Sequence, residues 1–133
     1  MKIENLKVGD TAECRQKVTD KTIQQYGEAS GDYNPIHFDD TYAKNSIFSG
    51  RIAHGLFCIG MISYLVGMVL PGEGSIFVDE QLRYVKPVYI GDEIRAKVCI
   101  DKIDYKKRLI TIKFECSNQN RQVVLEGITR VLL

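Results

Sequence analysis

The residues best suited to proton transfer lie together between Ser30 and His37, in the run Ser-Gly-Asp-Tyr-Asn-Pro-Ile-His. Asp32 offers a carboxylate, Asn34 an amide and His37 an imidazole, and His37 is one of only two histidines in the chain. Pro35 fixes its own φ and disfavours the helical region for Asn34, so the run predicts an irregular, bent connection. Loops of this kind often carry catalytic side chains. We expect Asp32 and His37 to meet across the bend with one water between them, although an Asx-type turn with a surface histidine is the structural alternative.

The elements before and after this run must position it. A strand is predicted around residues 11–18, and Thr19 is a good cap for a helix that reaches about Ala29. Ile23 and Tyr26 would face inward on that helix. A short helical turn is predicted near residues 40–44.

A long apolar segment follows, because residues 56–70 contain no charged side chain. A transmembrane helix needs about 20 residues, so this one is too short to cross a bilayer. A helix that is apolar on all sides must instead be surrounded by its own protein. Gly60 and Gly67 lie near one face of this helix. Either a neighbouring part of the core or the tail of a ligand could approach the helix closely there.

The second half of the chain predicts strands. Residues 94–100 and 110–116 alternate between apolar and polar side chains, which is the period of a sheet with one buried face. Strands are also predicted at 76–86, where Glu80 indicates a bulge or a subunit contact, and at 121–132. The intervening turns are short enough for antiparallel hairpins; they lie at residues 87–92, 105–108 and 118–120.

These patterns predict one α+β domain over residues 1–133, with a curved antiparallel sheet of about five strands wrapped around the apolar helix. This shape is called the hot-dog fold. Such a sheet leaves an open edge that a second copy can close, so we expect a homodimer or a higher oligomer of dimers.

Composition excludes several classes of function. The net charge of +1 gives no basic excess for nucleic acid or an anionic membrane. The amino terminus has no apolar signal segment. The four cysteines lie far apart, without a Cys-x-x-Cys pair, which argues against zinc and indicates reduced thiols in a cytoplasmic protein.

Several of these segments together resemble the MaoC-like (R)-specific enoyl-CoA hydratases. The resemblance rests on Gly31-Asp32-Tyr33-Asn34-Pro35-Ile36-His37, on Ala53-His54-Gly55 at the start of the apolar helix, and on the segments 70–75 and 86–92. It implies syn hydration of trans-2-enoyl-CoA to (R)-3-hydroxyacyl-CoA, or the reverse, with Asp32 and His37 as the catalytic residues. It implies no metal or redox cofactor, since CoA enters as part of the substrate.

Further residues have candidate roles around this pair. Gly55 is expected in the first turn of a helix, where its backbone N–H is a candidate oxyanion donor. The alternative is that a glycine is needed there only for tight packing. Asn34 holds the loop or the water, or is an ordinary turn residue. His54 is a possible second base or substrate-binding residue, but its ring is expected to bond to nearby backbone.

Two candidate positions lie further from the motif. Ser63 aligns with a serine near the active site of some family members, or its hydroxyl bonds back to its own helix. The basic run 106–108 meets the CoA phosphates or forms a solvated hairpin tip.

Two other functions remain open from the sequence. An acyl-CoA thioesterase on the same fold would attack the carbonyl, and a non-catalytic acyl-CoA-binding module would not need both proton-transfer groups. The sequence also leaves open the length of the acyl chain and whether CoA or acyl-carrier protein is the carrier. It does not decide the physiological direction, which could serve polyester storage, fermentation or fatty-acid metabolism.

Overall fold

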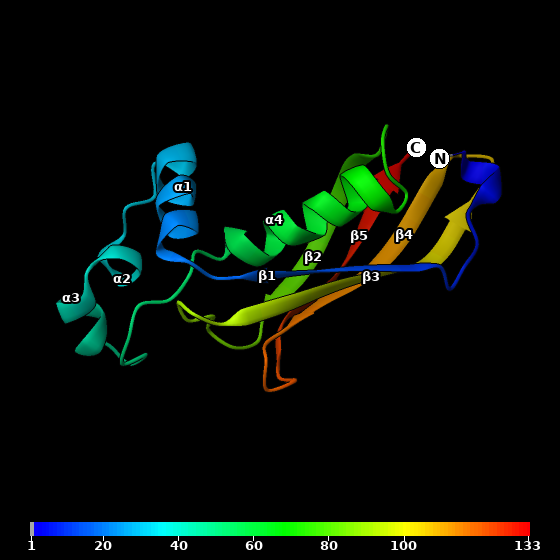
Figure 1. The fold of residues 1–133 in the computed structure, drawn as a ribbon. Helices are drawn as coiled ribbons and strands as arrows, with labels where there is room; N and C mark the ends of the chain where they lie inside the picture. Colours follow the sequence, from blue (N-terminus) through cyan, green and yellow to red (C-terminus); the bar gives the residue numbers. More distant parts are fainter. Residues whose placement is uncertain (1) are drawn as a thin grey trace.

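A computed structural model of the chain describes residues 2–133 and contains one sheet of five antiparallel strands (Figure 1). The order across the sheet is β1-β3-β4-β5-β2, which leaves β1 and β2 at the two edges. The strands are β1 Thr11–Lys17, β2 Ile76–Tyr84, β3 Glu93–Asp104, β4 Leu109–Ser117 and β5 Val123–Leu132. Sheet and central helix together give the expected α+β architecture.

The strand order corrects one prediction. The turn at residues 87–92 was expected to close a hairpin, but β2 pairs with β5 and β3 pairs with β1 and β4. The connection therefore crosses from the β2 edge to the other half of the sheet. The hairpins predicted at 105–108 and 118–120 are confirmed, because β3 pairs with β4 and β4 with β5. The β2 bulge lies between Phe77 and Asp79, just before Glu80.

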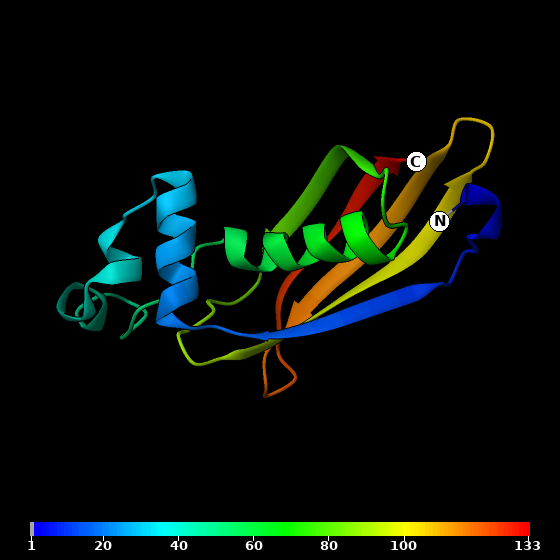
Figure 2. The same cartoon turned by 45° about the horizontal axis from the view of Figure 1, so that its top comes forward.

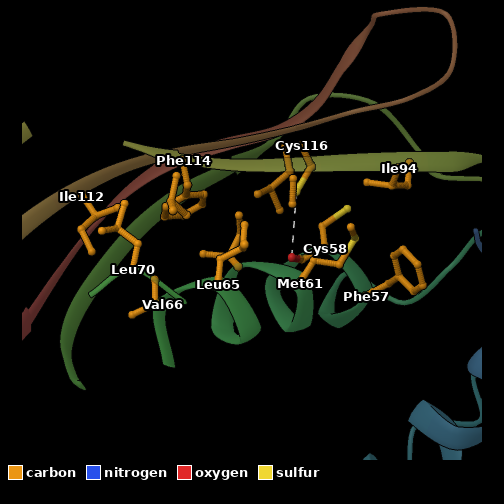
Figure 3. Close-up of a cluster of buried hydrophobic side chains, with 14 of the residues drawn as sticks. Phe57, Cys58, Met61, Leu65, Val66, Leu70, Ile94, Ile112, Phe114 and Cys116 are labelled. Carbon is orange, nitrogen blue, oxygen red and sulfur yellow. Dashed lines mark hydrogen bonds between the residues drawn. The ribbon is translucent and has the colours of Figure 1, made fainter. Parts of the chain in front are cut away.

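The inner face of the sheet is the alternating apolar face that the sequence predicts. In β3 and β4 the buried residues are Ile94, Ala96, Val98, Ile100, Ile110, Ile112, Phe114 and Cys116. Figure 3 shows Cys58, Met61 and Leu65 pointing from the central helical segment toward Phe114 and Cys116 of the sheet. Burying each large apolar side chain is worth about 1.5–3 kcal/mol, and this layer is the core of the fold.

The central helical segment differs from the prediction in two ways. Helix α4 spans Leu56–Tyr64 and continues as a π-helical turn, η2, over Leu65–Val69, so the segment is not one regular helix. It is also not enclosed on all sides, since Leu56, Tyr64, Met68 and Val69 are exposed. The sheet covers only one side of the segment, and these four side chains have little cover from the rest of residues 2–133.

Three further helices lie at one end of the sheet, with α1 Asp20–Ser30 next to the first turn of α4, and α2 Pro35–Phe38 and α3 Asp40–Lys44 farther out (Figures 1 and 2). A short 3₁₀ turn, η1 Ile3–Asn5, precedes β1. Thr19 caps α1 as predicted, with its hydroxyl accepting from the backbone N–H of Thr22.

Helix α2 corrects the expectation of a wholly irregular run between Ser30 and His37. Pro35 occupies the first helical position, where its fixed φ suits a helix and its missing N–H costs nothing.

Among residues 2–133 no helix is both long enough and apolar enough to cross a bilayer.

Candidate active site

The loop that carries Asp32 is held by its own polar atoms. Gly31 ends α1 in the left-handed region, with φ of 78°, a conformation that glycine adopts without strain. Oδ1 of Asp32 accepts from the backbone N–H of Asn34 at 3.1 Å. Oδ1 of Asn34 in turn accepts from the N–H of Ile36 at 3.2 Å and caps α2. Asn34 thus holds the loop, and Oδ2 of Asp32 is left for other partners.

His37 presents a free basic nitrogen to that carboxylate. Its Nδ1 lies 2.7 Å from the carbonyl oxygen of Ile52, and because a carbonyl only accepts, Nδ1 carries the proton. Nε2 therefore has a lone pair, and it lies 3.9 Å from Oδ2 of Asp32. The His37 side chain is almost buried, whereas that of Asp32 is about half exposed. The acid and the imidazole meet as expected, at a spacing too long for a direct hydrogen bond.

His54 packs directly on this pair. Its ring stacks on that of His37, with the centroids 4.0 Å apart and the planes at 27°. Its Nε2 lies 2.9 Å from the backbone carbonyl of Asp32 and donates to it, which leaves Nδ1 as a buried acceptor without a partner among residues 2–133. The expected bond from the His54 ring to nearby backbone is therefore present.

The same cluster of Asp32, His37 and His54 brings three possible metal ligands within 4.8 Å of one another. In two stacked rings the lone pairs run side by side instead of converging on one point. This arrangement disfavours a shared tetrahedral metal ion and favours separate roles for the two imidazoles.

Burial lowers the pKa of His37 below its ordinary value. The neighbouring His54 and the Arg51 guanidinium lower this pKa further. The bond to the Ile52 carbonyl and the Asp32 carboxylate raise it, but they do not outweigh burial. The net effect keeps the imidazole neutral, which is the form that can accept a proton.

Arg51 is a structural residue of the site that the sequence did not reveal. Its Nε donates to the backbone carbonyl of His37 at 2.7 Å, and a second nitrogen lies 2.6 Å from a carboxylate oxygen of Asp20. A third nitrogen lies 3.8 Å from Asp40. One almost buried side chain thus ties α1, α2 and α3 together. The only sequence signal was an isolated basic residue shortly before His54.

A cavity of about 580 Å³ opens beside the two histidines. Its lining is mostly apolar and joins the site to the sheet; the lining residues are His37, Phe48, Ile52, Ala53, His54, Gly55, Cys58, Tyr84, Val85, Lys86, Pro87, Val88, Val124 and Leu125. A second hollow of about 660 Å³ lies over β2, β3, β4 and β5. Its lining contains neither histidine nor Asp32. Asp32 is not among the lining residues of the first cavity either; its carboxylate is connected to that cavity through His37, whose Nε2 lies 3.9 Å away.

Gly55 lies in this cavity immediately before α4. Within residues 2–133 its backbone N–H has no hydrogen-bond acceptor, and it points from the positive end of the helix. The space beside its Cα is not empty, however. A Cβ atom built on Gly55 would lie 2.8 Å from Cε1 and 2.9 Å from the hydroxyl oxygen of Tyr84. The glycine therefore lets Tyr84 approach, a contact that the sequence did not predict.

Two other predicted positions lie away from the cavity. Ser63 is exposed on α4, does not line the cavity, and makes no bond back to its own helix within the described chain. The reason is that the sheet covers only the opposite side of α4. The basic run 106–108 lies in the β3–β4 hairpin, at the far end of the sheet from α1 and α2 (Figure 2).

The chain is similar to known proteins over almost its whole length. The family described as MaoC like domain matches residues 6–120. An (R)-specific enoyl-CoA hydratase of Rhodospirillum rubrum is 34% identical over 130 residues, which are 98% of this chain and 90% of that protein. A 3-hydroxybutyryl-CoA dehydratase of Methylorubrum extorquens is 35% identical over 124 residues, 93% of this chain and 78% of that protein. The solved (R)-hydratase from A. caviae involved in PHA biosynthesis superposes with a TM-score of 0.94 at 29% identity, covering 98% of each chain.

Proposed function

The chain belongs to the MaoC-like domain family, and from this membership and the site we propose that it catalyses reversible hydration of trans-2-enoyl-CoA to (R)-3-hydroxyacyl-CoA. The observation that carries the proposal is the pair of acceptors formed by His37 Nε2 and Asp32 Oδ2, which lie 3.9 Å apart, with His37 lining the cavity. The relatives named as hydratase and dehydratase support the same reaction class.

The 3.9 Å spacing suits a shared water molecule. A water that makes hydrogen bonds of about 2.8 Å to each acceptor stands at the apex of a triangle above them. Both of its protons then point at basic atoms, and its oxygen lone pair is directed away from the pair. This is the orientation that a nucleophilic water requires.

The reaction then needs one proton removed and one delivered. The water oxygen bonds to C3 of the enoyl thioester while His37 Nε2 takes one of its protons. C2 gains a proton from the same pair on the same face, which makes the addition syn. General acid–base catalysis of this kind contributes about 10²- to 10⁴-fold in rate. Asp32 and His37 share these protons as a coupled unit.

Charge that develops on the thioester oxygen needs a donor. The free N–H of Gly55 at the α4 terminus is placed to supply one, and loss of a single such donor in a protease costs about 2.7–4 kcal/mol. The chemistry uses protein side chains and backbone only, so we assign no metal or redox cofactor to it. The apolar lining of the cavity suits the acyl chain.

The active form is proposed to be a homodimer. Exposed apolar residues gather on the uncovered side of the central helical segment and on the β2 edge; they are Leu56, Tyr64, Met68, Val69, Ile76, Phe77 and Val78. A second copy that paired along β2 would cover both.

Turnover of crotonyl-CoA separates the three candidate functions. We expect loss of the enoyl absorbance without release of free thiol, and a 3-hydroxybutyryl product of R configuration. Free thiol release would identify a thioesterase. Saturable binding without consumption would identify a binding module, and either outcome would overturn the proposal.

A further inference from the structure

Tyr84 lies beside Gly55 in the cavity that His37 also lines. It is the last residue of β2, and its phenol ring lies against Gly55 at the beginning of α4. A Cβ on Gly55 would meet the ring at 2.8 Å, the hydroxyl at 2.9 Å and Cζ at 3.0 Å. Tyr84, Gly55 and His37 all line the same cavity.

The hydroxyl of Tyr84 is also a free donor. Within residues 2–133 it makes no hydrogen bond, and the residue is 59% exposed. Two other tyrosines show what a structural hydroxyl does in this fold. The hydroxyl of Tyr89 donates to the Phe48 carbonyl at 2.8 Å, and that of Tyr105 donates to the Leu6 carbonyl at 2.9 Å.

We propose that the Tyr84 hydroxyl is a second oxyanion donor, which binds the thioester oxygen together with the Gly55 N–H. The proposal rests on the proposed hydration reaction and names a further catalytic residue for it. A phenol hydroxyl carries a proton that it can donate in a hydrogen bond. Two donors on one oxygen stabilise the enolate-like charge more than one.

This assignment explains why residue 55 is glycine. Any side chain there would push the phenol away from the backbone N–H that shares its ligand. Gly55 thus has two functions: its N–H donates, and its missing side chain keeps the second donor within reach.

The test compares Tyr84→Phe with Tyr42→Phe on crotonyl-CoA. Tyr42 is 53% exposed, lies on α3 and does not line the cavity, so it is a matched loss of one exposed phenol hydroxyl. We expect Tyr84→Phe to lower kcat by about 10²-fold with little change in KM, because the donor acts mainly on the charged transition state. Tyr42→Phe should keep wild-type kcat.

Tyr84→Ala is the third variant and tests the ring separately. Wild-type kcat in Tyr84→Phe, with a loss only in Tyr84→Ala, would assign the residue to packing and overturn the proposal. A rise in KM alone in Tyr84→Phe would also overturn it. Failure of the wild-type chain to hydrate crotonyl-CoA and every longer trans-2-enoyl-CoA tested would instead refute the proposed function, so the two failures are distinguishable. Circular dichroism of each variant confirms that the fold is intact.

Discussion

At the scale of single residues, two backbone carbonyls define the chemistry of two imidazoles. The Ile52 carbonyl holds the proton of His37 on Nδ1, and the Asp32 carbonyl holds that of His54 on Nε2. The first bond exposes a basic nitrogen to Asp32, and the second fixes the loop from which Asp32 projects. The two imidazoles therefore carry their protons on different nitrogens although their rings are stacked.

The pH dependence follows from the environment of His37. Burial lowers its pKa below the ordinary 6.5, so the neutral base persists to lower pH than in a free histidine. We expect the acid limb of kcat/KM, and the NMR titration of the His37 ring, to have a midpoint below pH 6.5. Asp32→Asn should move the NMR midpoint lower still, because the carboxylate raises this pKa, and Arg51→Met should move it upward. A midpoint above 6.5 in the wild-type chain would contradict this description of the site.

At the scale of elements, the packing of α1 on α4 depends on a missing side chain. A Cβ on Gly60 would lie 2.1 Å from the hydroxyl oxygen of Tyr26, whereas a Cβ on Gly67 would meet nothing within 4 Å. We expect Gly60→Ala to lower the free energy of unfolding by about 1–2 kcal/mol through overpacking. Gly67→Ala should raise it by up to about 1 kcal/mol through helix propensity. Urea denaturation measures both, and Tyr26→Phe should partly restore Gly60→Ala. Equal effects of the two alanines would show that Tyr26 does not make this contact.

The three helices around the site are held together by Arg51. Its side chain is 13% exposed, whereas that of Arg83, which pairs with Glu126, is 76% exposed. Arg51→Met should cost about 1–3 kcal/mol of stability because hydrogen bonds to a charged group are lost. It should lower kcat by about 10- to 100-fold because His37 loses its support. Arg83→Met should cost less than about 1 kcal/mol and leave kcat unchanged. Thermal unfolding and crotonyl-CoA kinetics measure both variants, and matching results would contradict the role of Arg51.

The elements show which features were predictable from sequence and which were not. The alternation of Ile94 to Ile100 and the Thr19 cap are local patterns, and the structure confirms both. Arg51 contacts residues 14 and 31 positions away, and no local pattern encodes such a pairing. The approach of Tyr84 to Gly55 depends on the position of β2 at the sheet edge, which is equally non-local. The prediction of an irregular run around Pro35 was wrong for a different reason. Proline often ends helices, but here it begins one.

At the scale of the whole molecule, one chain leaves an apolar surface uncovered. Val78 belongs to edge strand β2 together with Ile76 and Phe77, and all three are exposed. In contrast, the other edge strand, β1, contains mostly polar residues. We expect sedimentation velocity at micromolar concentration to give twice the 15.1 kDa mass of the chain. Val78→Lys should shift the chain toward monomer, because lysines would meet across the β2 edge. Gln16→Lys on β1 should not. A monomeric wild-type chain would refute the dimer.

At the scale of the whole molecule, the central claim is that Asp32 and His37 activate a shared water beside an apolar cavity that His37 lines. The most direct measurement is the steady-state hydration of crotonyl-CoA by the wild-type chain, by Asp32→Asn and by His37→Gln, with circular dichroism to verify each fold. We expect each substitution to lower kcat at least about 100-fold while the spectrum stays unchanged. Near-normal turnover in both variants would contradict the account.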